Sequence, residues 1–390
     1  MSSLGPGGAE RVMVRVAGLL AESGFDVSIL PLLNADTSVA PDIHPEVRID
    51  RFEGEHYFSI PRPFKKVLLE KKFWLFFNAF FLSIKNVFKV FCPLISYIKK
   101  NSPDLILTAH YNSPVIFAVK LAKTRTKVVI VEHTVLSSHF SQFPWIVKKY
   151  YFWSCRFFYP RADKIVGVSQ SVLSDLREAV HISPGKLVCI FNPAAASYIE
   201  KMASAAAANH PWLPSTGEHP VFVAAGQLNK GKDYPTLLKA LALLRRRADA
   251  RLIVLGRGAL LQELQSLSKD LGIEDSVDWL GFVPNPFAYM KNSGFLVLSS
   301  TFEGLPTVVI EALALGISIA ATDSPGGIRE ILGDSEYGRL VPVGDYEALA
   351  NAMYENLQKP FDKKFLQARA NLFSEENARS GYESLIKELI

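Results

Sequence analysis

Two glutamates with chemical potential, Glu303 and Glu311, stand eight positions apart in the segment GFLVLSSTFEGLPTVVIEALALG, residues 294–316. The segment reads as a buried strand, a turn and a helix, so Glu303 lies in the turn and Glu311 one turn inside the helix. A carboxylate in the helix can accept hydrogen bonds from both hydroxyls of a ribose, as acidic residues do in dinucleotide-binding folds. The alternative is a solvated helix residue, but the apolar neighbours of Glu311 make that position costly unless it faces a polar cleft.

The turn between the two glutamates predicts an anion site. Its residues, Gly304, Leu305, Pro306 and Thr307, leave backbone N–H groups free at a helix start, where a phosphate would lie near Thr307. Glu303 could hold the hydroxyls of a second group. One strand-turn-helix unit is thus predicted to bind a sugar, a diphosphate and a ribose.

A second phosphate-type segment, GQLNKGK at 226–232, follows a predicted strand and almost matches a P-loop. Asp233 follows it in place of the Ser or Thr that holds magnesium, which disfavours a nucleoside triphosphatase. The sequence has no Asp-x-Asp for a divalent ion on a sugar nucleotide, so we expect no metal and no cofactor. Cationic side chains and helix amides must then stabilise a departing diphosphate.

Composition limits the class of protein that positions these residues. The 390 residues predict two domains, and 49% hydrophobic with 21% charged residues indicates a folded globular chain. Three cysteines without paired spacing suit a reducing cytoplasm. The net charge of +5 fits an anionic small molecule or membrane surface and gives nucleic acid little support.

Short apolar runs alternate with helical patterns along the chain, which predicts an α/β fold with two Rossmann-like, doubly wound parallel sheets facing a cleft. We assign residues 1–195 to an N-terminal domain, 196–219 to a linker and 220–374 to a C-terminal domain. The chain opens with a glycine-rich loop, a helix at 11–20 and a strand at 25–32, so the first strand of the N-terminal sheet is expected to be missing. The expected strands are 104–108, 127–131, 164–168 and 187–191 in the first half, and 221–225, 251–255, 276–280, 294–299 and 317–322 in the second.

Residues 62–100 combine many aromatic side chains with lysines and only one acid, Glu70. The longest uncharged run, 73–84, is about a dozen residues, whereas a membrane span needs about 20. Basic residues beside aromatics at helical spacing fit a helix that lies on an anionic membrane; the alternative is a buried helix with lysines on its solvent side. A second segment of this kind is FPWIVKKYYFWSCRFF, residues 143–158.

Taken together, these motifs resemble the retaining glycosyltransferases of family 4, which have the GT-B fold. The spacing of Glu303 and Glu311 and the turn EGLPTVVIEALALG carry the resemblance, and it extends over nearly the whole chain. Further matching segments are GPGGAER near the start, EHT at 132–134, FNPA at 191–194, GQLNKGKDYPTLLKALALL and LGFVPNPFAYM.

The resemblance implies a role for each matching residue. Glu311 would bind the donor ribose, and Glu303 with the amides of 304–307 would hold the donor sugar and diphosphate. Lys232 would neutralise the diphosphate, and His133 would face the sugar from the opposite domain. We therefore expect His133, Lys232 and Glu303 to be catalytic. The expected donor site comprises Gly7, Gly8, Gly226, Gln227, Lys232, Arg257, Val283, Glu303, Gly304, Leu305, Pro306, Thr307 and Glu311.

One position departs from the family pattern, because Gln227 stands where the family usually has Arg. Gln donates a neutral hydrogen bond, worth about 1 kcal/mol against about 1.5–3 for a charge-assisted one. Donor affinity would be lower unless Arg257 or Lys230 supplies the charge.

The resulting hypothesis is a retaining transferase that moves a sugar from a nucleotide-diphosphate sugar, UDP rather than GDP, to a glycan or lipid-linked glycan in cell-surface polysaccharide synthesis. The resemblance places it at the cytoplasmic face of the membrane and packs its last helix, 375–390, back on the first domain. Two alternatives are a sugar-nucleotide epimerase of the same fold and a non-catalytic partner subunit.

Overall fold

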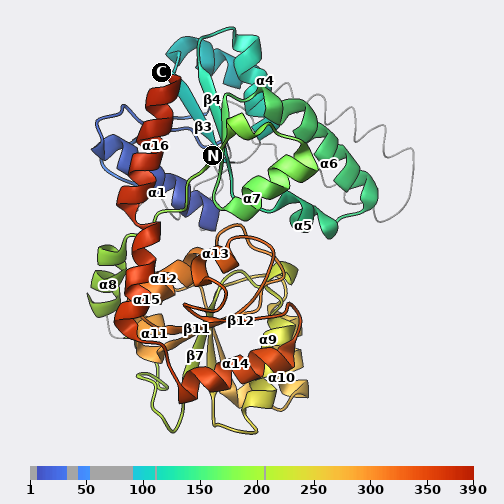
Figure 1. Ribbon diagram of the computed structural model, residues 1–390, viewed down its shortest axis with the longest axis vertical. Coiled ribbons are helices and arrows are strands. Elements are labelled where there is room, and N and C mark those ends of the chain that lie inside the picture. The colour runs from blue at the N-terminus through green and yellow to red at the C-terminus, as the bar shows by residue number, and fades with distance from the viewer. Residues whose placement is uncertain (1–6, 33–42, 53–90, 110–111, 206–207) are drawn as a thin grey trace.

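The computed structural model describes residues 7–32, 43–52, 91–109, 112–205 and 208–390. Figure 1 shows two halves, one above the other, each built of parallel strands flanked by helices. The upper half holds most of the blue-to-green part of the chain together with the red last helix, and the lower half holds most of the yellow-to-red part. This confirms the predicted α/β class with two Rossmann-like domains.

The lower half contains a six-stranded sheet in the order β12-β11-β10-β7-β8-β9, and all its pairs are parallel. Helices cover both faces, so the four inner strands are almost wholly buried, whereas the edge strands β9 and β12 are partly buried. The strands are β7 (Val221–Ala225), β8 (Arg251–Leu255), β9 (Val277–Gly281), β10 (Phe295–Leu298), β11 (Ser318–Thr322) and β12 (Arg339–Val341). The helices are α9 (Tyr234–Leu244), α10 (Leu261–Asp270), α11 (Pro286–Ser293), α12 (Thr307–Leu315), α13 (Ile328–Leu332), α14 (Tyr346–Gln358) and α15 (Lys363–Ala370).

The upper half contains a four-stranded parallel sheet in the order β3-β4-β5-β6. Its strands are β3 (Leu105–Thr108), β4 (Lys127–Glu132), β5 (Lys164–Gly167) and β6 (Leu187–Cys189). Its helices include α1 (Gly8–Glu22), α4 (Asn112–Ala122), α5 (Leu136–Ser141), α6 (Trp145–Phe158) and α7 (Gln170–Asp175), and α7 continues as a π-helical turn over Leu176–Val180.

The strand predicted at 25–32 is wrong in length, because β1 covers only Ser28–Ile29. It pairs with β2 (Arg48–Ile49) in a separate two-stranded sheet. The strand is short because only two residues of each segment are paired. The expectation of a missing first strand concerns the segment before α1, of which residues 1–6 lie outside the described chain.

Two helices connect the halves. α8 (Ala196–Ala205), within the segment assigned as a linker, packs on α11 and α12, and Lys291 Nζ lies 2.8 Å from Glu200 Oε1. α16 (Glu375–Leu389) runs beside α1 (Figure 1). Ion pairs fix it there: Arg15 with Glu375, Arg379 with Glu22, and Lys164 with Glu388. The end of the chain therefore returns to the upper half.

Most of the basic and aromatic segment 62–100 lies outside the described residues, which resume at Phe91. Residues 91–101 are helical. Within the described part of the chain, no helix has the length and apolar character that crossing a membrane requires.

Candidate active site

Lys232 and Glu303 form an ion pair in the lower half. Lys232 ends the short helical turn after β7, and Glu303 lies in the loop between β10 and α12. Lys232 Nζ lies 2.5 Å from Glu303 Oε1, and the Ser300 hydroxyl donates to the same oxygen at 2.6 Å. The backbone N–H of Glu303 donates to the Pro325 carbonyl at 2.9 Å, which fixes the loop. Two residues that the sequence placed in separate motifs are thus in direct contact.

The loop that carries Lys232 depends on close backbone packing. A Cβ on Gly226 would lie 3.2 Å from Lys232 Cε, so the lysine stem runs directly over this glycine. A Cβ on Gly256 would overlap the carbonyl oxygen of Gly226, and one on Gly258 would overlap that of Leu228. The Gly-Arg-Gly sequence at 256–258 therefore lets the loops after β7 and β8 touch.

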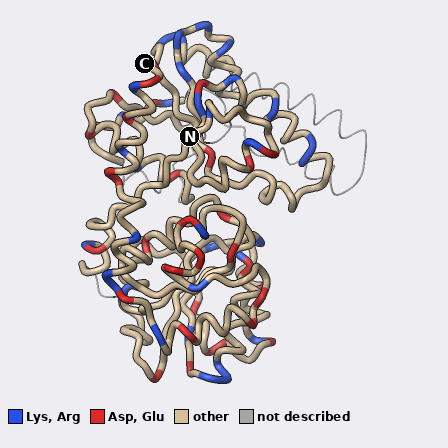
Figure 2. Tube along the Cα trace, in the orientation of Figure 1, with Lys and Arg blue, Asp and Glu red and all other residues tan. Residues whose placement is uncertain are grey.

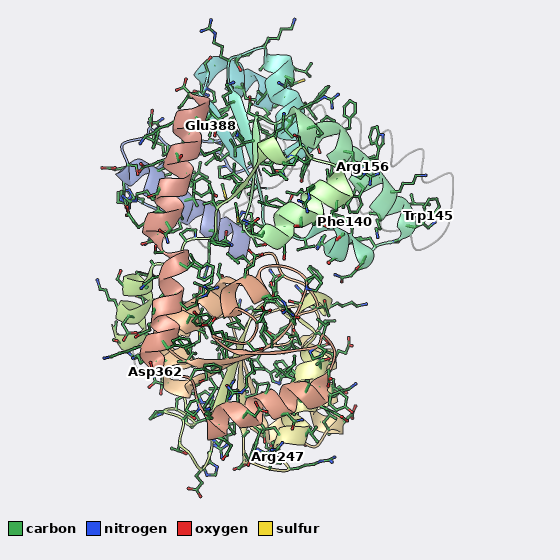
Figure 3. All side chains as sticks on the ribbon, in the orientation of Figure 1. Phe140, Trp145, Arg156, Arg247, Asp362 and Glu388 are labelled. Atoms are coloured by element: carbon green, nitrogen blue, oxygen red, sulfur yellow. The ribbon has the colours of Figure 1, made fainter. Side chains whose placement is uncertain are left out.

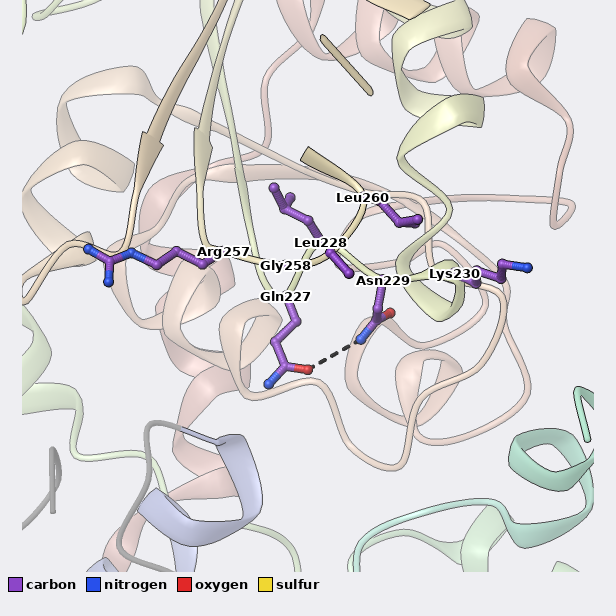
Figure 4. A pocket seen from close by; sticks show the side chains of 8 residues that line it. Gln227, Leu228, Asn229, Lys230, Arg257, Gly258 and Leu260 are labelled. Carbon is purple, nitrogen blue, oxygen red and sulfur yellow. Dashed lines mark hydrogen bonds between the residues drawn. The ribbon is translucent and has the colours of Figure 1, made fainter. Parts of the chain in front are cut away.

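Beside this loop lies a pocket of about 480 Å³. Its lining comes from the loops after β7 and β8: Gln227, Leu228, Asn229, Lys230, Arg257, Gly258, Ala259 and Leu260. Figure 4 shows Gln227 and Asn229 side by side, joined by a hydrogen bond of 3.3 Å from Asn229 Nδ2 to Gln227 Oε1. Lys230 and Arg257 extend to opposite sides of the pocket (Figure 4). Lys230 and Arg257, the two cations that could supply the charge that Gln227 lacks, therefore lie at different ends of the pocket.

The first turn of α12 follows the buried residues Gly304, Leu305 and Pro306. Thr307 begins the helix, and the cap residue Pro306 offers no side-chain acceptor for its N–H groups. Glu311, one turn further, is half-buried. Burial raises the pKa of Glu311 to about 7, and the positive charge of Arg11 on α1 opposes that rise. The Glu311 carboxyl group therefore changes its ionisation near neutral pH.

His133, in the upper half, lies against the turn that precedes α12. It follows β4, and a Cβ on Gly304 would overlap the His133 carbonyl oxygen. The ring of Phe302 contacts that of His139 edge to face, with 5.8 Å between centroids. The two halves therefore meet at the turn predicted to bind the donor.

Glu132, the residue before His133, is buried. The Tyr159 hydroxyl donates to Glu132 Oε2 at 2.9 Å, and Asn112 Nδ2 donates to the same hydroxyl at 3.0 Å. Backbone N–H groups of His133 and Thr134 also bond to the carboxyl group, and burial raises its pKa to about 7. This anchor for the His133 loop was not among the predicted site residues, although the EHT segment contains it.

The remaining predicted residues are Gly7, Gly8 and Val283. Gly7 is the cap of α1 and Gly8 its first residue, and a Cβ on Gly8 would meet nothing within 4 Å. Val283 follows β9 and is half-buried.

The sequence reasoning missed two side chains in this region, Arg11 and Phe282. The guanidinium of Arg11 lies 5.7 Å from the centroid of the Phe282 ring, and that of Arg257 lies 6.0 Å from it. Phe282 thus has a cation from each half beside it. Both missed residues stand inside segments that carried the family resemblance, GPGGAER and LGFVPNPFAYM.

Two Rossmann-like halves that meet at the turn before α12, beside a pocket of the lower half, have the arrangement of the GT-B fold. A family model for "Glycosyltransferase Family 4" matches residues 6–196, and one for "Glycosyl transferases group 1" matches residues 208–372. The chain therefore belongs to the family 4 glycosyltransferases.

Named proteins similar to this chain agree with that assignment. One is the N-acetylgalactosamine-N,N'-diacetylbacillosaminyl-diphospho-undecaprenol 4-alpha-N-acetylgalactosaminyltransferase of Campylobacter jejuni, 31% identical over 95% of this chain and 91% of its own length. A second, from the same organism, is a GalNAc-alpha-(1->4)-GalNAc-alpha-(1->3)-diNAcBac-PP-undecaprenol alpha-1,4-N-acetyl-D-galactosaminyltransferase, 26% identical over 90% of this chain and 86% of its own length. The crystal structure of Anabaena Alr3699/HepE with UDP and glucose shares the fold, with a TM-score of 0.73 at 19% identity, covering 97% of this chain and 96% of that one.

Proposed function

We propose that the protein is a retaining glycosyltransferase that moves a sugar from a nucleotide-diphosphate sugar, with UDP as the nucleotide, to a lipid-linked glycan. The observation that carries the proposal is the Lys232–Glu303 pair beside the start of α12, where the His133 loop abuts Gly304. A cation and a carboxylate, with free helix amides, suit a sugar diphosphate better than either charge alone.

Each group of the donor has a matching partner in this proposal. The N–H groups at the start of α12 and the Lys232 ammonium take the diphosphate, and Glu303 takes hydroxyls of the sugar. Glu311 accepts from the ribose. Arg257 and Lys230, at opposite sides of the pocket, offset the neutral Gln227.

The proposed reaction keeps the configuration of the anomeric carbon. The bond between that carbon and the phosphate oxygen breaks, and a bond to the acceptor hydroxyl oxygen forms on the same face. The acceptor proton passes to the leaving phosphate oxygen. Lys232 and the α12 amides stabilise the negative charge on the diphosphate, so the proposed step needs no metal ion.

A lipid-linked acceptor and an anionic membrane surface are supported by α6. The two Campylobacter relatives carry undecaprenol diphosphates in their names. On α6, large apolar side chains are exposed, with Trp145 at 70%, Tyr150 at 69% and Trp153 at 57%. Figure 3 shows Trp145 at the outer edge of the upper half, and Figure 2 shows basic residues on the same side. Such a surface fits the inner, cytoplasmic face of the cell membrane.

The test uses purified full-length protein, a set of UDP-sugars and GDP-sugars, and a polyprenyl-diphosphate disaccharide as acceptor. We expect UDP release only when acceptor is present, unchanged by EDTA, and NMR of the product should show the donor's anomeric configuration. Nucleotide release from donor alone would indicate an epimerase. Failure to bind any nucleotide sugar in calorimetry would indicate a non-catalytic subunit, and inversion would refute retention.

A further inference from the structure

A carboxylate from the lower half caps a helix of the upper half. Glu330, on α13, accepts from the first two N–H groups of α7. Gln170 N lies 2.8 Å from Glu330 Oε2, and Ser171 N lies 2.9 Å from Oε1. Helix starts leave such N–H groups without intrahelical acceptors, and a carboxylate there also meets the positive end of the helix dipole.

Ser169, the residue before α7, extends the contact to the donor turn. Its side chain is wholly buried, and its hydroxyl donates to the Gly304 carbonyl at 3.1 Å. The Ser169 hydroxyl oxygen also accepts from Val172 N at 3.2 Å, so Ser169 caps α7 from within the upper half. A Cβ on Gly327 would lie 3.0 Å from Ser169 Cβ, which shows how closely the halves pack here.

The carboxylate stands on a helix that is itself held in the lower half. Arg369, on α15, donates to the Glu330 carbonyl at 2.6 Å and to the Ile331 carbonyl at 3.0 Å. A substitution of the Glu330 side chain leaves these backbone contacts in place. The side chain can therefore be changed without releasing α13 from its own half.

These contacts end at the turn that the proposed function assigns to the donor. Gly304 receives the Ser169 hydroxyl on its carbonyl, and the His133 carbonyl packs against its Cα. We propose that Glu330 is a positioning residue, whose carboxylate caps α7 across the two halves and so keeps the turn at 304–307 seated against the His133 loop. The consequence for sugar transfer rests on the proposed function, whereas the consequence for the arrangement of the halves does not.

The direct test compares Glu330→Lys with Glu263→Lys by small-angle X-ray scattering of the full-length protein without ligand. Glu263 is an exposed residue of α10 in the same half, so its variant has the same change in net charge. An ammonium cannot accept from Gln170 and Ser171 and is repelled by the helix start. We expect the radius of gyration to rise for Glu330→Lys alone. An unchanged radius, or an equal rise in both variants, would overturn the proposal.

A second variant keeps the test decisive if the lysine disturbs folding, which circular dichroism would reveal. Glu330→Gln has the same shape but only one acceptor oxygen, so one of the two hydrogen bonds survives. The population of the seated arrangement should then fall by about tenfold relative to the separated one, because a charge-assisted hydrogen bond is lost. Chemical cross-linking between the halves should fall in Glu330→Gln and remain unchanged in Glu263→Gln. Equal cross-linking in both would count against the proposal.

Kinetics then separate positioning from the proposed function itself. With Glu330→Gln we expect kcat to fall by up to about tenfold, since the seated arrangement is less populated, while the Kd for UDP changes little. A Kd that rises in parallel with kcat loss would show that Glu330 supports the donor pocket and not the contact of the halves. If the unmodified protein transfers no sugar, the scattering result still decides the positioning claim.

Discussion

The two halves of the molecule share a fold class but present different surfaces. The lower half has six strands, a helix start without a side-chain cap, and an ion pair of 2.5 Å between residues that the sequence singled out. Among its described residues, the upper half has a four-stranded sheet and, separately, a two-stranded ladder. Its clearest surface feature is the run of exposed aromatic residues on α6.

This difference follows from what each half is proposed to bind. A nucleotide diphosphate has fixed charges and hydroxyls, which call for particular residue types at particular spacings. An acceptor glycan on a lipid varies between enzymes, and a membrane requires only exposed apolar and basic side chains. Chemistry of the first kind is visible in a single sequence, whereas recognition of the second kind is spread over a surface.

The sharpest test of the lower half removes the Lys232 ammonium. In Lys232→Ala we expect kcat to fall by about 10²–10³-fold, the usual effect of losing one preorganised charge stabiliser. The loss should exceed the change in donor affinity, because charge builds on the diphosphate as the sugar leaves. Steady-state rates with UDP-sugar and acceptor measure it.

Lys230→Ala is the matched control for that change. Lys230 is exposed and extends to the far side of the pocket (Figure 4), so its loss should affect mainly donor affinity. Equal losses of kcat in the two variants would remove the distinction between a lysine at the reacting bond and one at the rim.

A second test concerns the contact between the two halves at Gly304. In Gly304→Ala the added methyl group would overlap the His133 carbonyl, and overpacking of this kind costs about 1–3 kcal/mol. We expect the halves to separate and kcat to fall by about tenfold or more, while UDP still binds the lower half. Scattering and calorimetry measure these two effects. Gly217→Ala, where a Cβ meets nothing within 4 Å, should leave both unchanged.

Several elements of the lower half could be predicted closely from the sequence. The strands at 221–225 and 251–255 coincide with β7 and β8, because each is a short apolar run bounded by glycine or proline. The sequence did not predict β12, because this strand has only three residues and begins with Arg339. It lies at the edge of the sheet, where only its last residue is buried. In the upper half the run at 25–32 looked like a full strand, but only two of its residues find a partner strand.

The candidate site, too, could be predicted in part: most of its residues within the lower half were found, and the contacts between the halves were not. The contact between Lys232 and Glu303 joins two motifs that the sequence had each marked as phosphate-binding. The contacts that Ser169 and Glu330 make between the halves could not be predicted, because their partners are far away in the chain and neither residue belongs to a recognised motif. Arg11 and Phe282 were missed because their partners belong to different halves or loops.

A smaller effect is expected from Glu311, whose pKa is raised to about 7 by burial. A ribose that donates two hydrogen bonds prefers the ionised carboxylate, so donor binding should strengthen as pH rises through 7 and weaken as it falls. Between pH 8 and pH 6 we expect about a tenfold loss of UDP affinity, measured by calorimetry.

Glu311→Gln is the control for this pH dependence, since its side chain does not titrate. It should bind UDP more weakly at pH 8 and show a flatter profile, set by the nucleotide's own phosphate groups. A profile as steep as that of the unmodified protein would show that another group causes the dependence.

The smallest expected effect lies on α6, in the upper half. Tyr150 is 69% exposed there, and Tyr346, on α14 of the lower half, is 37% exposed. Burying one aromatic side chain in a membrane interface contributes about 1 kcal/mol, so Tyr150→Ala should weaken binding to anionic vesicles by about fivefold. Tyr346→Ala should not, and vesicle sedimentation compares the two. Equal weakening would mean that membrane attraction is a property of the whole charge and not of α6, and the division of roles between the halves would fail at the surface where it is now drawn.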